Sequence, residues 1–544
     1  MGSLFLSFCL FAIVQSVPTT DVFINSDGVN ATIRGYQFSY GKSFRGIRYA
    51  HPPIGSLRFQ YAHEYVPVGI TEALNFGNIC TQRSGSGDED CLFINVFTPV
   101  GATNTSKLPV YLYFHGGGFV TGSGFMRSSI FSNLVNRGNI VMVTVNYRLG
   151  PFGFFSSRQK DSAGNWAVSD WVQAINWVNK YIEFFGGDNT RVTIGGQSAG
   201  AEATSSISLL SEVQGKYQHL IMESASAFSA AVISYSESTR NTSSQLAINA
   251  NCATNSSWQS GSDFENILEC LRNLSTQQIV ELDGNLPNHR MKWGLVQDTK
   301  YFSERLEYLA SRRPTSTKIL IGNVNHEWLL WELKNIENDL NSVHNTKTQL
   351  ISDFNSSYEM TYWTNQASIT NAALGQYVLN KNWSNTDYVN WEAERIKLWS
   401  EMVFIGPVLR DASYFRYNGN PVYLYSLDWL SPAAYPNITE EQLRGCPHGW
   451  DLQYILNEQC NGFNCTTSDD ILREYFTTLW VNFVRYGNPT PPNTSLPFKW
   501  LPLDKTNRYL SLQPNPTMKT NYHYGSYFWA CTAPTIDGYK PPFC

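Results

Sequence analysis

The sequence predicts an α/β protein with a large, mostly parallel central sheet flanked by helices. Residues 110–114 and 140–145 are continuous apolar runs, which are typical of strands buried on both faces of a parallel sheet. Between residues 165 and 185 apolar side chains recur at helical spacing, and Gly186 marks the end of that helix. The β-rich residues 191–194 follow. This alternation of strands and helices indicates βαβ units and therefore a parallel sheet.

Later segments are expected to extend this sheet and to surround it. Residues 220–222, 318–321 and 422–425 are short β-rich runs that predict further strands. The polar residues 335–399 predict helices and loops on the surface, around the functional site expected below. No internal repeat or low-complexity linker divides the chain, so we expect a single domain over residues 17–544.

Composition and the chain ends limit the partners and the compartment. The 544 residues carry a net charge of −5, and 14% are aromatic, which excludes a disordered chain. The lack of a Lys/Arg cluster argues against nucleic acid as a partner. Residues 1–16 are uncharged and mainly apolar, which predicts a secretory signal peptide. We expect no transmembrane segment and no GPI anchor, because no later run is long and apolar enough.

Asn-x-Ser/Thr triplets support export through the secretory pathway. They are acceptors for N-linked glycosylation, and their density is above the chance level. We therefore expect a secreted, extracellular glycoprotein. The triplets begin at Asn30, Asn104, Asn241, Asn255, Asn273, Asn355, Asn382, Asn437, Asn464 and Asn493.

The cysteines predict disulfides rather than metal ligands. In an oxidising compartment most of them should pair, and close sequence neighbours are the natural partners. We expect the disulfides Cys80–Cys91 and Cys252–Cys270. The pairing of the remaining cysteines stays open; these are Cys446, Cys460, Cys465, Cys531 and Cys544. Among them Cys460 with Cys465 and Cys531 with Cys544 are closest in sequence, which leaves Cys446 over. No Cys-x-x-Cys or His-x-x-x-His occurs, so the sequence predicts no metal and no cofactor.

The motif that carries most chemical information is Gly196-x-Ser198-x-Gly200. It stands between the β-rich residues 191–194 and the helix-prone residues 201–210. A strand that turns sharply into a helix around Gly-x-Ser-x-Gly is the nucleophile elbow of α/β-hydrolases. The serine occupies a strained turn, and a Cβ two residues to either side would collide with the backbone there. We therefore expect the α/β-hydrolase fold, with Ser198 as the nucleophile.

A second glycine-rich segment predicts the donors that stabilise the oxyanion. Residues 114–119 follow an expected strand, and their three glycines let backbone N–H groups approach a substrate oxygen. In α/β-hydrolases the remaining donor is the N–H just after the nucleophile. The predicted oxyanion hole consists of Gly117, Gly118 and Ala199.

Four further blocks accompany these two motifs, namely residues 44–59, 89–96, 146–150 and 184–188. Together with the elbow and the glycine loop, they resemble the type-B carboxylesterase/cholinesterase family. The resemblance runs from about residue 20 into the C-terminal region. It implies the α/β-hydrolase fold and hydrolysis of a small-molecule ester through an acyl-enzyme intermediate.

The resemblance also indicates the other two catalytic residues, which should follow the serine in the order acid, then histidine. Glu327 matches the family's Gly-x4-Glu segment, although Trp328 stands where the family has a small residue. His448 matches its Gly-x-x-His-Gly-x-Asp/Glu segment. Glu327 would orient the imidazole, and His448 would act first as base and then as acid. The rivals, interpreted as structural because they occupy flanking motif positions, are His115, His326 and Asp451.

Two supporting roles are implied by the same resemblance. Arg58 and Glu89 match positions that form a buried ion pair. Ser224 matches a serine that hydrogen-bonds the triad carboxylate, although the family's Gln-Ser-Gly is Glu-Ser-Ala here.

Departures from the family pattern bear on the substrate. Cholinesterases hold a quaternary ammonium with a tryptophan in the first disulfide loop, through a cation–π contact, and with a glutamate just before the serine. Here residues 81–90 contain no aromatic side chain and Gln197 is neutral, which favours uncharged, apolar esters. Gln-Ser-Ala-Gly is similar to juvenile hormone esterases, so juvenile-hormone-like or lipid esters are an alternative. Ala230 and Ala231 stand where cholinesterases place bulk in the acyl pocket.

Two alternatives without strong catalysis are a cholinesterase-like adhesion protein, as neuroligins are, and a storage protein. An adhesion protein of this kind would normally have lost a triad residue. Ser198, Glu327 and His448 are all present, which favours the enzyme.

Overall fold

The computed structural model describes residues 17–26, 28–157, 164–229, 237–261, 263–287, 292–298, 300–356, 363–456, 460 and 462–544. The predicted signal peptide at residues 1–16 lies outside the described residues, as do Ala230 and Ala231.

The strands are β1 (Thr19–Ser26), β2 (Val29–Phe38), β3 (Gly41–Arg48), β4 (Gly69–Glu72), β5 (Phe93–Thr98), β6 (Leu108–Phe114), β7 (Val141–Val145), β8 (Gly187–Gln197), β9 (His219–Glu223), β10 (Lys318–Val324), β11 (Val422–Leu427), β12 (Tyr509–Leu512) and β13 (Thr517–Lys519). The α-helices are α1 (Gly150–Phe154), α2 (Trp166–Tyr181), α3 (Ala199–Ile207), α5 (Glu237–Asn249), α6 (Asn255–Ser260), α7 (Phe264–Arg272), α8 (Thr276–Gly284), α9 (Leu306–Ala310), α10 (Leu329–Asp339), α11 (Lys347–Ser356), α12 (Gln366–Leu374), α13 (Tyr388–Ser400), α14 (Gly406–Tyr417), α15 (Leu452–Ile455), α16 (Thr467–Tyr486) and α17 (Ala533–Ile536).

Within the described residues, thirteen strands form one sheet in the order β1-β2-β3-β5-β7-β6-β8-β9-β10-β11-β12-β13, with β4 paired to β2. The pairs from β7 to β12 are parallel. The chain of pairs from β1 to β7, and the last pair β12–β13, are antiparallel. The predicted sheet is therefore confirmed in its centre and is mixed overall, because the N-terminal hairpins continue it as an antiparallel extension.

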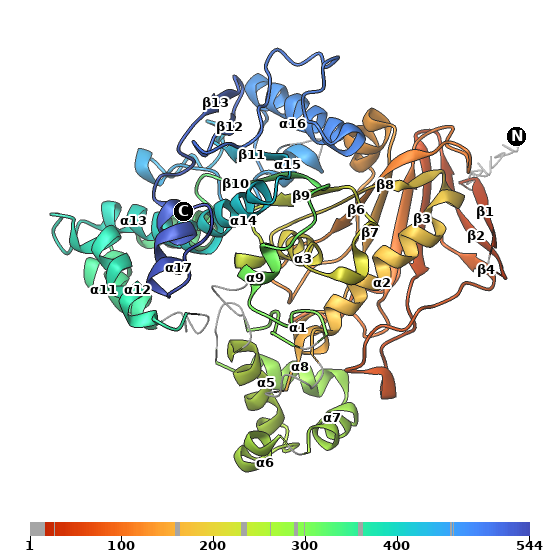
Figure 1. Ribbon diagram of the computed structural model, residues 1–544, viewed down its shortest axis with the longest axis horizontal. Helices are drawn as coiled ribbons and strands as arrows, with labels where there is room; N and C mark the ends of the chain where they lie inside the picture. The colour runs from red at the N-terminus through yellow and green to blue at the C-terminus, as the bar shows by residue number, and fades with distance from the viewer. Residues whose placement is uncertain are drawn as a thin grey trace, which may run out of the picture.

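The central strands are buried on both faces, as their continuous apolar sequences predict. In β6, Val110 and Leu112 join one core cluster together with residues of α2 and α3. Tyr111 and Tyr113, which alternate with them, join a second cluster together with α16. In Figure 1, β1 and β2 lie at one end of the molecule and α11–α13 at the other, while α5–α8 form a group below the sheet.

The predicted helix at residues 165–185 is present as α2 followed by a 3-10 turn at Ile182–Phe185. Gly186 ends it with φ 88°, a left-handed conformation that favours glycine. Residues 335–399 do form helices, but they are not purely a surface layer, since Trp391 and Trp399 are buried in the core.

Four disulfides join the described cysteines. Cys80–Cys91 and Cys252–Cys270 are confirmed, and the open pairings are 460–465 and 531–544. Cys446 is a buried free thiol. None of the helices in the described part of the chain is both long and apolar enough to cross a membrane.

Candidate active site

Ser198 stands at the turn between β8 and α3. Its backbone has φ 58° and ψ −129°, a conformation that side-chain-bearing residues rarely adopt. A Cβ on Gly196 would lie 2.5 Å from the Gly200 and Phe114 carbonyl oxygens, and one on Gly200 would lie 2.0 Å from the Phe114 oxygen. The strand-turn-helix geometry therefore requires both glycines, and it presents the serine side chain at the carboxyl edge of the sheet.

The glycine loop after β6 lies against this turn. A Cβ on Gly116 would come within 3.0 Å of the Ser198 Cβ and 2.7 Å of the Gln197 carbonyl oxygen. Gly117 has φ 113°, and a Cβ there would meet the Thr121 carbonyl oxygen at 2.1 Å. The loop thus packs directly against the serine turn at Gly116, where a Cβ would collide, and Gly117 adopts a backbone conformation that favours glycine.

The carboxylate of Glu327 holds the imidazole of His448. Glu327 follows β10 and is fully buried, and its Oε2 lies 2.5 Å from His448 Nδ1. Its other oxygen accepts hydrogen bonds from Asn323 Nδ2 at 3.1 Å and from the Val324 backbone N–H at 3.0 Å. The backbone N–H of His448 also donates to the Glu327 carbonyl at 3.1 Å. The ring is therefore held with Nδ1–H toward the acid, which leaves the lone pair on Nε2.

Gln197 is a neighbour of His448 as well as of the serine. Its Nε2 lies 3.3 Å from His448 Nε2. Because Nδ1 carries the proton, the amide donates to the lone pair of Nε2. A histidine that acts as a general base would use this same lone pair.

Aromatic side chains cover the imidazole, and the sequence alone did not identify them. Phe404 and Trp331 lie with ring centroids 4.6 and 5.4 Å from that of His448, and they stack on each other at 5.7 Å. Trp331 is 40% exposed and Phe404 is buried. Trp331 follows Glu327 by four residues, about one helical turn, and this spacing could have indicated that its ring lies near the triad. Phe404 comes from a π-helical segment, Glu401–Ile405, and carried none.

The three rival residues, His115, His326 and Asp451, are buried or half-buried. Burial lowers the pKa of His115 and that of His326 to about 4, so both rings are neutral near pH 7. His115 stacks on Tyr147 with ring centroids 4.4 Å apart. Asp451 is fully buried, and burial, followed by the charge of Glu327, raises its pKa to about 7.

Ser224 does not make the contact that the resemblance implies. Its hydroxyl is buried and has no hydrogen-bond partner among the described residues. The oxygens of Glu327 are instead occupied by His448, Asn323 and Val324. The side chain of Asn323, which sequence reasoning did not single out, therefore takes the supporting role.

The implied ion pair between Arg58 and Glu89 is present and buried. Arg58 Nε donates to one carboxylate oxygen at 2.7 Å and Nη2 to the other at 2.5 Å. A third nitrogen, Nη1, donates to the carbonyls of Leu271 and Leu274. The pair therefore ties the first disulfide loop to the segment around α7.

Comparison with known proteins agrees with this geometry. The family model described as "Carboxylesterase family" matches residues 24–528. Human carboxylesterase 5A is 30% identical over 524 residues, which cover 91% of this chain and 85% of the relative. A duck medium-chain fatty acyl-CoA hydrolase precursor is 26% identical, covering 88% of this chain and 87% of the relative. Human cocaine esterase is 28% identical, with coverage of 88% and 84%.

The nucleophile elbow, the adjoining glycine loop, the mixed sheet and these relatives lead to one conclusion: this chain belongs to the carboxylesterase family and is a carboxylic ester hydrolase of the α/β-hydrolase fold.

Proposed function

We propose that the protein hydrolyses uncharged, apolar carboxylic esters with Ser198, His448 and Glu327 as its catalytic triad. The observation that carries this proposal is the contact between His448 Nδ1 and Glu327 Oε2 at 2.5 Å, on a ring whose other nitrogen faces the residue next to the serine. A base oriented by a buried acid beside a strained serine is the arrangement that acyl transfer needs.

In this mechanism His448 Nε2 takes the proton of the Ser198 hydroxyl as its oxygen attacks the ester carbonyl. The backbone N–H groups of Gly117, Gly118 and Ala199 receive the oxyanion, and Ala199 is the first residue of α3, where N–H groups lack partners within the helix. The imidazolium then protonates the leaving alcohol. A water molecule releases the acid from the acyl-enzyme by the same steps in reverse.

The proposed preference for uncharged esters rests on what surrounds the reacting atoms. The side chain beside the nucleophile is the neutral Gln197, which is buried against His448. The aromatic rings of Trp331 and Phe404 offer an apolar surface next to the base. The duck relative is named for medium-chain fatty acyl groups, which makes acyl chains of that length worth testing here.

We also propose that the protein is a secreted glycoprotein. Every asparagine of the ten predicted glycosylation sites is exposed in the structure. Four disulfides are consistent with folding in an oxidising compartment. When the protein is expressed in secreting cells, it should appear in the medium, and treatment with an N-glycosidase should lower its mass. Retention inside the cells without a mass change would contradict this proposal.

The catalytic proposal is tested with a fluorophosphonate probe and a matched pair of esters. Wild type should be labelled at Ser198, and Ser198→Ala should be neither labelled nor active. Acetylcholine and 3,3-dimethylbutyl acetate differ only in the charge of the alcohol, and the neutral ester should have the higher kcat/KM. An equal or higher kcat/KM for acetylcholine would contradict the substrate class, whereas failure of labelling would contradict the triad.

A further inference from the structure

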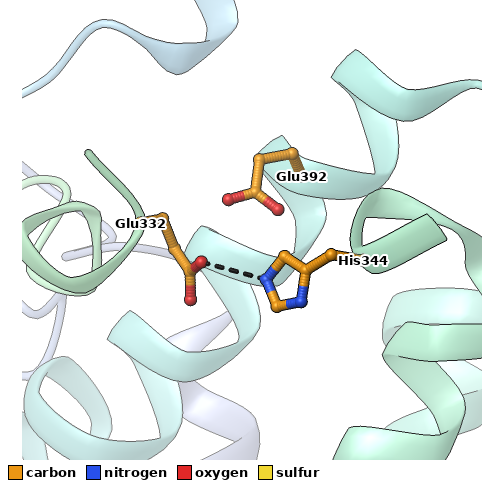
Figure 2. Close-up of side chains that lie close together, drawn as sticks. All are labelled: Glu332, His344 and Glu392. Atoms are coloured by element: carbon orange, nitrogen blue, oxygen red, sulfur yellow. Dashed lines mark hydrogen bonds and ion pairs between the residues drawn. The ribbon is translucent and has the colours of Figure 1, made fainter. Parts of the chain in front are cut away.

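A cluster of three metal-ligating side chains lies behind the active site and takes no part in the proposed mechanism. Glu332 lies on α10, His344 on a short helix at Val343–Asn345, and Glu392 on α13. Figure 2 shows the three side chains converging from these separate segments. One oxygen or ring nitrogen from each lies within 4.8 Å of the others, and Glu332 Oε2 is 3.2 Å from His344 Nε2.

The cluster contains a buried carboxylate that its neighbours satisfy poorly. Glu392 is fully buried, and neither of its carboxylate oxygens has a hydrogen-bond partner of good geometry among the described residues. Arg395 Nε lies 3.3 Å from Glu392 Oε2, but the same guanidinium also pairs with Asp353 at 2.5 Å. It donates as well to the His344 carbonyl oxygen at 2.6 Å, so Glu392 shares this one cation with other groups.

A divalent cation between the three side chains would give the Glu392 carboxylate the partner that it lacks, without moving the helices apart.

We propose that Glu332, His344 and Glu392 bind a divalent transition-metal ion of the zinc type. One imidazole nitrogen and two carboxylate oxygens form a donor set that Zn²⁺ accepts, whereas Ca²⁺ and Mg²⁺ prefer oxygen ligands alone. Zinc–ligand distances of about 2.0–2.2 Å place tetrahedral ligands about 3.3 Å apart. The measured 3.2 Å between Glu332 Oε2 and His344 Nε2 fits one such edge. The open fourth position would hold water.

The site is distinct from the triad, but the same helix leads to both. The indole Nε1 of Trp328 donates to Glu332 Oε1 at 2.9 Å, and Trp328 directly follows Glu327. Trp331, on the same turn as Glu332, stacks on His448. Metal bound at the cluster would therefore fix α10 against α13 next to the aromatic wall of the active site, whatever ester the enzyme hydrolyses.

The test uses the full-length, glycosylated protein stripped with EDTA and titrated with Zn²⁺ by calorimetry. Wild type should bind one tight equivalent. Glu392→Gln and His344→Gln should each weaken binding by at least about 100-fold, since even outer partners of a metal ligand are worth 10–100-fold. The matched control is Glu337→Gln, which changes an exposed glutamate on α10, the helix that carries Glu332, and should bind Zn²⁺ as tightly as wild type does.

Two further measurements decide the ambiguous cases. Fluorophosphonate labelling of each variant counts the folded protein, because none of these substitutions touches the triad. His344 is 37% exposed, so its replacement should fold even if replacement of the buried Glu392 does not. X-ray absorption on zinc-loaded wild type should show one imidazole and carboxylate oxygens. Absence of a tight equivalent in wild type, unchanged binding in folded His344→Gln, or a shell of several imidazoles would overturn the proposal.

Discussion

Replacing Gly200 by alanine would place a Cβ 2.0 Å from the Phe114 carbonyl oxygen, 2.8 Å from its carbon and 2.9 Å from the His115 carbonyl oxygen. All three are backbone atoms, so no side-chain rotation can relieve the contact. Cβ contacts essentially never fall below 3.0 Å, and the shortest of these must therefore open by about 1.0 Å, from 2.0 to 3.0 Å.

The backbone that must move is the part that carries the proposed chemistry. Phe114 and His115 lead into the glycine loop, and Gly200 follows Ser198 and Ala199 at the start of α3. A misplacement of about 1 Å costs on the order of 10²-fold in rate, and loss of one oxyanion donor costs about 10²–10³-fold. Gly200→Ala should therefore lower kcat/KM by about 10²–10³-fold.

The assay is hydrolysis of p-nitrophenyl acetate, with the active-site concentration taken from fluorophosphonate labelling and the fold checked by thermal unfolding. Gly284→Ala is the matched control, because that glycine ends α8 with nothing within 4 Å of an added Cβ. It should keep full activity and gain up to about 1 kcal/mol of stability. If Gly200→Ala hydrolyses the ester as fast as Gly284→Ala does, the reasoning about the elbow is refuted.

Three further predictions test the electrostatics. Glu327→Gln keeps the shape of the acid but removes its charge, and should lower kcat by about 10⁴-fold with little change in Tm; a loss below tenfold in stopped-flow assays would contradict its role. Burial raises the pKa of Glu202 to about 8, above its value in the unfolded chain. Ionising Glu202 therefore destabilises the folded state as pH rises between about 4.5 and 8, by up to about 1.4 kcal/mol per pH unit. Glu202→Gln should flatten this part of the urea-unfolding profile, and parallel profiles would contradict the assignment. Arg58→Ala leaves Glu89 buried without its charged partner and should lower the free energy of unfolding by about 3–5 kcal/mol. The control Lys107→Ala breaks an exposed ion pair and should lower it by less than about 1 kcal/mol. Equal losses in urea unfolding would contradict the burial argument.

The motifs that could be predicted from the sequence are those in which one short segment carries both the strand end and the reactive side chain. Gly196, Ser198 and Gly200 record a backbone turn that only small residues allow, and the structure has that turn. The parallel centre of the sheet was predictable for the same local reason, because β6 and β7 consist almost entirely of apolar and aromatic residues. The antiparallel extension was not predicted. Its β1–β2 and β2–β3 pairs are tight hairpins with short local turns, whereas β3–β5 and β5–β7 join strands that are not consecutive and leave no local pattern.

The side chains that escaped prediction depend on tertiary packing. Phe404 reaches His448 from a π-helical segment that no sequence spacing marks. Glu332 and His344 are 12 residues apart in different short elements, and Glu392 comes from a third helix, so no ligand-spacing motif could reveal the cluster. Asn323, near the end of β10, donates to Glu327 in place of the expected Ser224, and no sequence spacing marked this contact.

The placement of charge around His448 gives a physical basis for the proposed ester class. Burial, followed by the charge of Asp451, raises the pKa of Glu223 well above its usual range, and that of Asp451 is itself raised to about 7. The acid in contact with the ring is Glu327, and in the proposed mechanism its charge stabilises the imidazolium. On the substrate side of the same ring stands the neutral amide of Gln197. In the proposed mechanism the charge of Glu327 thus lies on the Nδ1 side of the ring, where it stabilises the imidazolium, while a cationic alcohol gains no ionic partner from residue 197.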